Sequence, residues 1–173
     1  RSVCVKNESS GKIYLNKIES ASLDFLYGDY ELLTFYGRHA MERNVQRVPV
    51  VHGTQKIGSV RGTSSHQYNP AMILCDPAAT EDFGSCYGFC FAYSGNFVAG
   101  AQKDQIGLTR VQMGINPVQF RYTLAAGEAF FAPQVLMSYS SEGFTGLTHQ
   151  YHDLIREHIC RGAYKHAKRP VLI

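Results

Sequence analysis

Short β-type runs, each closed by a turn signal, recur along most of the chain and constrain its fold more than any other feature. Valine, isoleucine and aromatic residues gather in these runs, and Gly, Pro, Asn and Asp separate them at intervals of roughly eight to twelve residues. This pattern predicts a mainly β chain folded as an antiparallel β-sandwich. The expected strands cover residues 2–5, 13–15, 22–26, 30–35, 44–51, 56–60, 71–75, 87–93, 96–101, 108–115, 120–124 and 130–139.

Two local signals refine the expected sheets. Pro49 has no N–H to donate, so we expect the run at 44–51 at an edge or a bulge rather than in a central strand. The pair Ser94-Gly95 separates the runs at 87–93 and 96–101, which predicts that these two strands form a hairpin.

One segment near the C-terminus departs from the β pattern. Its apolar residues recur at helical spacing and predict a single amphipathic helix. We expect Ser141 or Thr145 as its N-cap, Glu142 in its first turn and Gly162 just beyond its end. The apolar positions are Leu147, Tyr151, Leu154, Ile155 and Ile159.

The composition fits one globular domain. The chain has 173 residues, of which 45% are hydrophobic and 18% are charged, enough apolar material for a core. The formal net charge of +3 is mild, and the basic residues are scattered outside 161–169, so we expect no nucleic-acid partner. No run approaches the roughly 20 apolar residues of a membrane-spanning helix, so we expect no membrane partner.

The cysteines indicate a reducing compartment. There are five, an odd number at irregular spacings, and no CxxC pair is present. We therefore expect buried free thiols and a cytoplasmic location.

Motifs for several kinds of chemistry are absent from the sequence. No GxSxG elbow, GxGxxG loop or Walker-type loop is present, which argues against serine hydrolase and nucleotide chemistry. His149 and His152, with His158 beyond them, lack a third ligand at a fixed spacing, so we expect exposed or interface histidines rather than a metal site. Cys86 and Cys90 share one face of a predicted strand and are expected as core thiols. The sequence therefore predicts no metal and no cofactor.

Paired carboxylates, as glycoside hydrolysis requires, are the remaining kind of catalytic site. Spacing alone does not show which acids converge, and turn positions already explain several of them. The 11 Tyr and 10 Phe residues leave stacking on a sugar ring open, although sheet packing explains most of them. The acids considered are Asp24, Asp29, Glu42, Asp104 and Glu128.

The most distinctive polar segment is the stretch at 61–70, which lies between two predicted strands. Hydrogen-bonding side chains fill six consecutive positions of it, more than a simple turn needs. We take Ser65, His66, Gln67 and Asn69 as its candidate site residues. The alternative is a self-satisfied loop whose side chains bond to backbone groups.

Ordered motifs along nearly the whole chain closely resemble the amino-terminal domain of glycoside hydrolase family 36 α-galactosidases. The polar stretch at 61–70 is the most specific of them. The other matching motifs are residues 20–25, 37–38 with 42–43, 52–55, 93–97, 114–115, 127–130, 138–140, 143–144, His152 with Arg156 and His158, and 169–173.

The resemblance implies a fold, an activity and partners. Such domains are a large, galactose-mutarotase-like β-sandwich called a supersandwich, placed before a catalytic (β/α)8 barrel. The enzymes remove terminal α-galactosyl residues from oligosaccharides with retention, and their catalytic aspartates lie at the ends of barrel strands. The resemblance therefore implies that no catalytic residue lies in this chain. It also implies the protein's own barrel and α-galactoside oligosaccharides as partners, and a homo-oligomer, often a tetramer.

The same resemblance divides the chain. We expect a β-sandwich at 1–140 that is truncated at its N-terminus, a linking helix and basic connection at 141–168, and the start of the first barrel strand at 169–173. The chain opens on Arg1 directly before a strand and closes on an apolar run, which also predicts a segment of a larger protein.

Three roles remain open for such a domain. The first is a non-catalytic domain of an α-galactosidase, packed on the barrel through the helix at 147–160. Its loop at 61–70 would then lie near the active-site rim or a neighbouring subunit. The second is a stand-alone carbohydrate-binding module. The third is an oligomerisation module, whose exposed apolar helix stripe would drive self-association.

Overall fold

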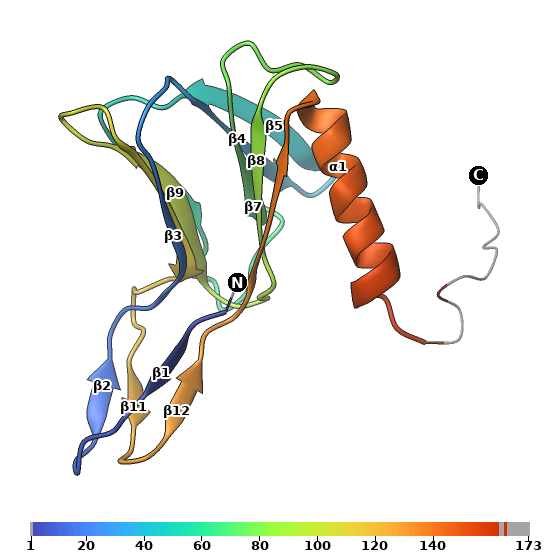
Figure 1. The fold of residues 1–173 in the computed structure, drawn as a ribbon. Coiled ribbons are helices and arrows are strands. Elements are labelled where there is room, and N and C mark those ends of the chain that lie inside the picture. The colour runs from blue at the N-terminus through green and yellow to red at the C-terminus, as the bar shows by residue number, and fades with distance from the viewer. Residues whose placement is uncertain (1, 163–164, 166–173) are drawn as a thin grey trace.

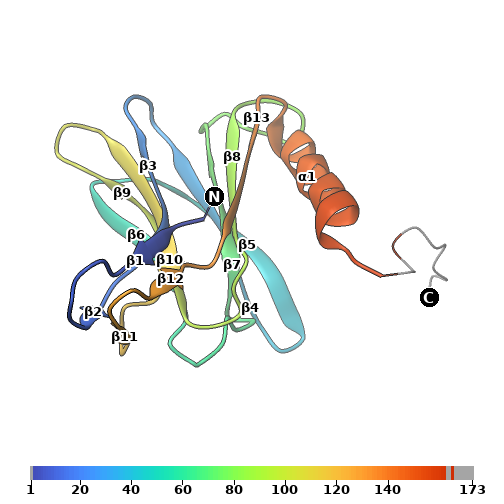
Figure 2. The same cartoon turned by 60° about the horizontal axis from the view of Figure 1, so that its bottom comes forward.

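Two antiparallel sheets face each other and hold the core between them (Figures 1 and 2). The computed structural model describes residues 2–162 and 165, so the predicted strand start at 169–173 lies outside the described residues. One sheet has the order β13-β8-β7-β4-β5 and the other β3-β10-β9-β6, and two small sheets, β1-β12 and β2-β11, extend from one end. The expected mainly β sandwich is confirmed.

The strands lie close to the predicted runs. Their bounds are β1 (Cys4–Lys6), β2 (Ile13–Leu15), β3 (Glu19–Phe25), β4 (Glu31–Arg38), β5 (Met41–Pro49), β6 (Gly53–Gly58), β7 (Tyr68–Cys75), β8 (Cys86–Phe91), β9 (Phe97–Lys103), β10 (Thr109–Ile115), β11 (Tyr122–Leu124), β12 (Ala129–Phe131) and β13 (Val135–Ser140).

Side-chain alternation explains the core. On β10, Val111 and Met113 point inward and are fully buried, whereas Arg110 between neighbouring inward positions points outward and is exposed. Phe97 on β9 and Leu74 on β7 meet them from the two sheets in one cluster. Burial of each such large side chain stabilises the fold by about 1.5–3 kcal/mol.

The predicted hairpin around Ser94-Gly95 is wrong. β8 and β9 belong to different sheets, and residues 92–96 carry the chain across the sandwich. Phe91 and Phe97, at the two ends of this crossing, are both buried in the shared core. Pairing the strands with each other would remove one of these rings from the opposite wall of the core, so inter-sheet packing overrides the turn signal.

Three prolines lie at places where the observed strands agree with or depart from the predicted ones. β5 is an edge strand that ends at Pro49, as expected. The predicted run at 130–139 is two strands, β12 and β13, interrupted around Pro133, and they pair with different partners. Pro70 lies inside the central strand β7, beside a register shift between Thr34 and Tyr36 of β4, where a missing N–H is tolerated.

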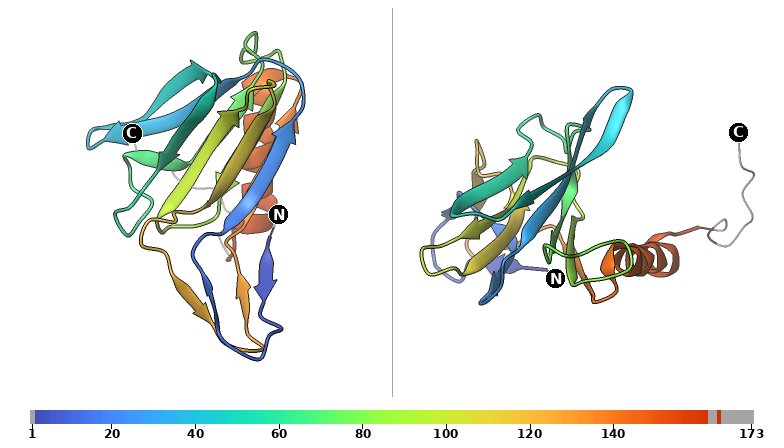
Figure 3. Two further views of the ribbon diagram at one scale, coloured as in Figure 1. Left: turned by 90° about the vertical axis from the view of Figure 1, so that its left-hand side faces the viewer. Right: turned by 90° about the horizontal axis from the view of Figure 1, so that it is seen from above.

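The predicted helix is confirmed, but its start is not. It comprises α1 (Gly143–Leu154) and a π-helical turn, η1 (Ile155–Ile159), and it lies outside the five-stranded sheet, away from the four-stranded one (Figure 3). Glu142 is the N-cap, without any side-chain cap, so the expected caps Ser141 and Thr145 are wrong.

Backbone carbonyl groups of the β7–β8 turn replace the missing side-chain cap. The N–H groups of Gly143, Phe144 and Thr145 donate to three carbonyl oxygens of this turn, at 2.9–3.0 Å. A Cβ on Gly143 would lie 2.3 Å from one of these oxygens, so this position requires glycine. The accepting carbonyls belong to Gly84, Thr80 and Glu81.

Arg47 on the edge strand β5 holds the same turn from the other side. Its guanidinium donates to the carbonyls of Asp76, Pro77 and Ala79 at 2.8–3.1 Å, pairs with the Glu31 carboxylate and lies 5.5 Å from the Phe144 ring centroid. One side chain therefore ties an edge strand, a turn and the first turn of the helix together.

The helix is seated on a small second cluster of buried residues. Leu147 packs there with Cys75 and Cys86, and Tyr151 donates a hydrogen bond to the Leu136 carbonyl at 3.1 Å. The expectation of buried thiols holds for Cys75 and Cys86, which lie opposite each other in the register of β7 and β8 with free thiols. Cys90 is half-buried. It is wrong for the remaining two cysteines, Cys4 and Cys160, which are exposed.

Candidate functional site

The backbone of the polar loop between β6 and β7 is held in place from several sides. Gly62, with a φ of +84°, donates its N–H to Asn96 Oδ1 at 2.6 Å, and Ser64 donates to the Ser94 carbonyl at 2.7 Å. At the far end, the Gln67 carbonyl accepts from Gly37 N–H at 3.1 Å. The crossing that follows β8 and the strand β4 therefore fix the loop's path.

Two further polar side chains brace the start of the loop. The buried Ser59 hydroxyl donates to the Thr63 carbonyl at 2.6 Å. Asn116 Nδ2 donates to the carbonyls of Ser59 and Phe97 at 3.1 and 3.2 Å and so joins the loop to the four-stranded sheet. The backbone of the loop is preorganised by these bonds.

The four predicted site residues have three different placements. Ser65 Oγ is used internally, because it accepts the Gln67 N–H at 3.2 Å. Asn69 is half-buried within β7, so the loop proper ends earlier than predicted. His66 and Gln67 are exposed, and their side chains have no hydrogen-bond partner among the described residues. The loop thus presents two free polar side chains on a fixed backbone.

The carboxylates considered for catalysis each have a local partner. Hydrogen bonds from Arg110 lower the pKa of Asp24, and a hydrogen bond from Lys103 lowers the pKa of Asp29. The other three acids accept backbone N–H groups: Glu42 from Ala40, Asp104 from Ile106 and Leu108, and Glu128 from Ala125. Hydrogen bonds and ion pairs within the chain therefore account for all five carboxylates, as the sequence indicated for the acids at turn positions.

The helix histidines are not drawn together with other ligands. His149, His152 and His158 are exposed, and no group of three or more His, Cys, Asp or Glu side chains in residues 2–162 and 165 has the arrangement of a metal site. No helix within these residues is long and apolar enough to cross a membrane.

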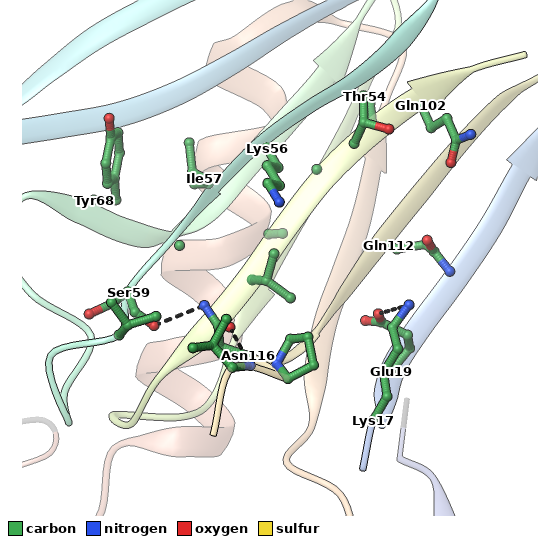
Figure 4. Close-up of a pocket in the computed structure, with 18 of the residues that line it drawn as sticks. Lys17, Glu19, Thr54, Lys56, Ile57, Ser59, Tyr68, Gln102, Gln112 and Asn116 are labelled. Atoms are coloured by element: carbon green, nitrogen blue, oxygen red, sulfur yellow. Dashed lines mark hydrogen bonds and ion pairs between the residues drawn. The ribbon is translucent and has the colours of Figure 1, made fainter. Parts of the chain in front are cut away.

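A groove of about 560 Å³ lies over the outer face of the four-stranded sheet (Figure 4). Polar side chains from β3, β6 and β10 line it, among them Glu19, Lys56 and Gln112, and it reaches Ser59 and Asn116 at the start of the polar loop. Sequence reasoning missed this groove. Its lining residues come from strands far apart in the chain, and each alone resembles an ordinary outward-facing position.

Comparison with known proteins identifies the family. The model of the glycosyl hydrolase family 36 N-terminal domain matches residues 1–125, and the Melibiase model matches residues 129–173. The chain is 54% identical over 173 residues to the bifunctional alpha-galactosidase/sucrose kinase AgaSK of Mediterraneibacter gnavus. It is 43% identical over the same length to the alpha-galactosidase AgaA of Geobacillus stearothermophilus. All of the chain is covered in both alignments, but only 18% and 24% of those two proteins.

Solved structures agree with the sequence comparison. The galactosidase domain of AgaSK superposes with a TM-score of 0.95 over 98% of this chain and 24% of that one. AgaA superposes with a TM-score of 0.95 over 97% of this chain and 23% of that one, at 42% identity. Since the family model covers well over half of its residues, the chain belongs to the glycosyl hydrolase family 36 N-terminal domain family.

Proposed function

We propose that the chain is a non-catalytic part of an α-galactosidase that removes terminal α-galactosyl residues from oligosaccharides with retention. The observation that carries this proposal is the family 36 match over residues 1–125, together with relatives that are named α-galactosidases. The local partners of the five carboxylates support an inactive role for this chain itself.

A direct test compares the full-length protein with the 173-residue chain on p-nitrophenyl α-galactoside. We expect hydrolysis by the full-length protein and none by the chain. Proton NMR of the first product should show α-galactose before mutarotation, as retention requires. Initial release of β-galactose, or activity of the chain alone, would contradict the proposal.

The domain boundaries follow from the same proposal. We propose a sandwich at 1–140, a linking segment at 141–168 and the entry to the protein's own catalytic barrel at 169–173. The outer end of the helix supports a contact with that barrel, because Ile155 and Ile159 are 43% and 45% exposed.

We further propose a cytoplasmic homo-oligomer, a tetramer by family resemblance, without a nucleic-acid partner. The free cysteines support a reducing compartment. The net charge of +3 is too mild for an electrostatic nucleic-acid footprint.

For the polar loop we propose a position at the rim of the substrate site or against a neighbouring subunit, with Ser65, His66, Gln67 and Asn69 as its residues. The support is the fixed backbone and the two exposed, unpaired side chains of His66 and Gln67. A stand-alone carbohydrate-binding or oligomerisation module remains the alternative role.

Replacement of His66 by alanine in the full-length protein separates these positions. At a substrate rim, loss of one hydrogen bond to the sugar should raise KM about two- to tenfold and leave the oligomer intact. The exposed helix residue His149 provides the control, since H149A should leave KM unchanged. An unchanged KM for H66A removes the rim position, and dissociation of the oligomer would indicate the subunit contact.

A further inference from the structure

The groove over the four-stranded sheet has an open floor between polar walls. Lys56, Gly100 and Gln112 are register neighbours on β6, β9 and β10, so two long side chains flank a position that has none. Val98 lies in the next outward row, between Gly58 and Gly114. Between the polar walls, these two rows therefore contribute one apolar side chain, that of Val98, and otherwise glycine backbone.

Several polar groups on the walls lack partners within the protein. Glu19 Oε2 is buried and has no hydrogen-bond partner among the described residues, although Oε1 of the same carboxylate pairs with Lys17 at 3.1 Å. The side chains of Lys56 and Gln112 form no hydrogen bond or ion pair with any described residue. The Lys56 ammonium and the Gln112 amide are therefore free to bond to a ligand in the groove.

The charges around the groove nearly cancel. Arg110 is occupied by a bidentate pair with Asp24 at 2.6 and 2.8 Å, and Lys17 by the Glu19 carboxylate. Lys56 is then the one lining cation without an ion pair in the described part of the chain. Phosphate or polyanion binding would need a cluster of free cations, so the chemistry favours a neutral ligand.

We propose that this groove binds a neutral oligosaccharide. A sugar ring presents an apolar C–H surface that suits this floor, and hydroxyl groups that both donate and accept. Lys56 Nζ donates to a sugar hydroxyl, and the Gln112 amide both donates and accepts. The volume of about 560 Å³ falls within the range of about 300–1,000 Å³ that is usual for small-molecule sites.

The test is calorimetric titration of raffinose into the full-length protein in saturating 1-deoxygalactonojirimycin, an iminosugar that occupies AgaA in one related structure. We expect binding with a dissociation constant on the order of 1 mM. The double variant K56A/Q112A should weaken it at least about tenfold, because each change removes a hydrogen bond. K12A/Q105A, which alters two exposed residues outside the groove, should bind as the unmodified protein does.

A flat titration, or equal weakening by the two double variants, would overturn the proposal. Crystals of the unmodified protein soaked in raffinose give a second measurement that depends on no variant, and absence of sugar density over Gly100 would also overturn it. The proposed function enters in the choice of raffinose as probe and of the iminosugar as blocker of the substrate site. Failure of the iminosugar to bind would count against that function, while the comparison of the variants still decides the groove.

Discussion

The two thiols beneath the helix illustrate how burial sets the chemistry of single residues. Cys75 and Cys86 lie opposite each other on β7 and β8, and neither side chain is exposed. Burial raises the pKa of each thiol from 9.0 to about 11, although the charge of Arg47 acts in the opposite direction. Because the thiolate is the reactive form, both residues should be chemically inert in the folded protein.

Alkylation by iodoacetamide at pH 8 tests this expectation. The exposed Cys4 and Cys160 serve as internal controls and should react at least about 100-fold faster than Cys75 and Cys86, because burial shields these two thiols from the reagent and raises their pKa to about 11. The pH dependence of stability follows from the same burial. Because the folded-state pKa of the Cys75 thiol lies above the unfolded value, this difference stabilises the fold below pH 9, and the stabilisation is lost as the pH rises towards 11. Equal labelling rates, read by peptide mass spectrometry, would contradict the burial.

The residue types predicted where polar side chains cluster, but not which hydrogen bonds those side chains form. The richness of the 61–70 stretch identified a loop that does present free side chains, His66 and Gln67. The internal use of Ser65 depends on the turn its own backbone makes. The bracing hydrogen bonds of Asn96 and Asn116 come from the sheet crossing and from the residue that follows β10, so no local pattern could reveal them.

At the scale of elements, the helix packs closely on the sheet because Gly88 beneath it has no side chain. A Cβ on Gly88 of β8 would lie 2.6 Å from Tyr151 Cε2 and 3.1 Å from Leu147 Cδ2. Any larger residue must therefore push the helix away from its seat.

The substitution Gly88→Ala should destabilise the protein by about 1–3 kcal/mol, the usual cost of overpacking. Gly11→Ala is the matched control, because a Cβ there meets nothing within 4 Å, and it should change stability little. Urea unfolding of the two variants measures the difference. Equal midpoints would show that the helix is not packed against Gly88.

Element types followed from the sequence, whereas sheet membership did not. Alternation on β10 and helical spacing after residue 143 are local signals, and both are reproduced in the structure. The strands around Ser94-Gly95 were wrongly joined because a short polar connection is compatible with a hairpin or with a crossing. The burial of Phe91 and Phe97 on opposite walls decides between them, and that is a long-range property.

At the scale of the whole molecule, the apolar stripe of the helix is buried at its start and exposed at its end. Leu147 is 2% exposed, but Ile155 and Ile159 are 43% and 45% exposed, so the apolar stripe continues past the sheet that covers its start. If the proposed catalytic barrel covers this end in the full-length protein, the chain alone leaves it in water.

We therefore expect the 173-residue chain to self-associate as its concentration rises, and the I155S/I159S variant to remain monomeric. Sedimentation velocity measures both, and V45S/V51S, which alters two exposed valines elsewhere, is the control. A chain that stays monomeric at every concentration would show that the stripe is too small to drive assembly.

The β7–β8 turn that caps the helix has a consequence for sequence change. Surface turns usually tolerate insertions because nothing depends on their length. Here Arg47 donates hydrogen bonds to one side of the turn. The carbonyl groups of turn residues 80, 81 and 84 fix where the helix begins. An added residue between 77 and 84 would move the start of the helix and redirect all of the polypeptide that follows it. This exterior turn is therefore expected to accept substitutions but to resist changes in length.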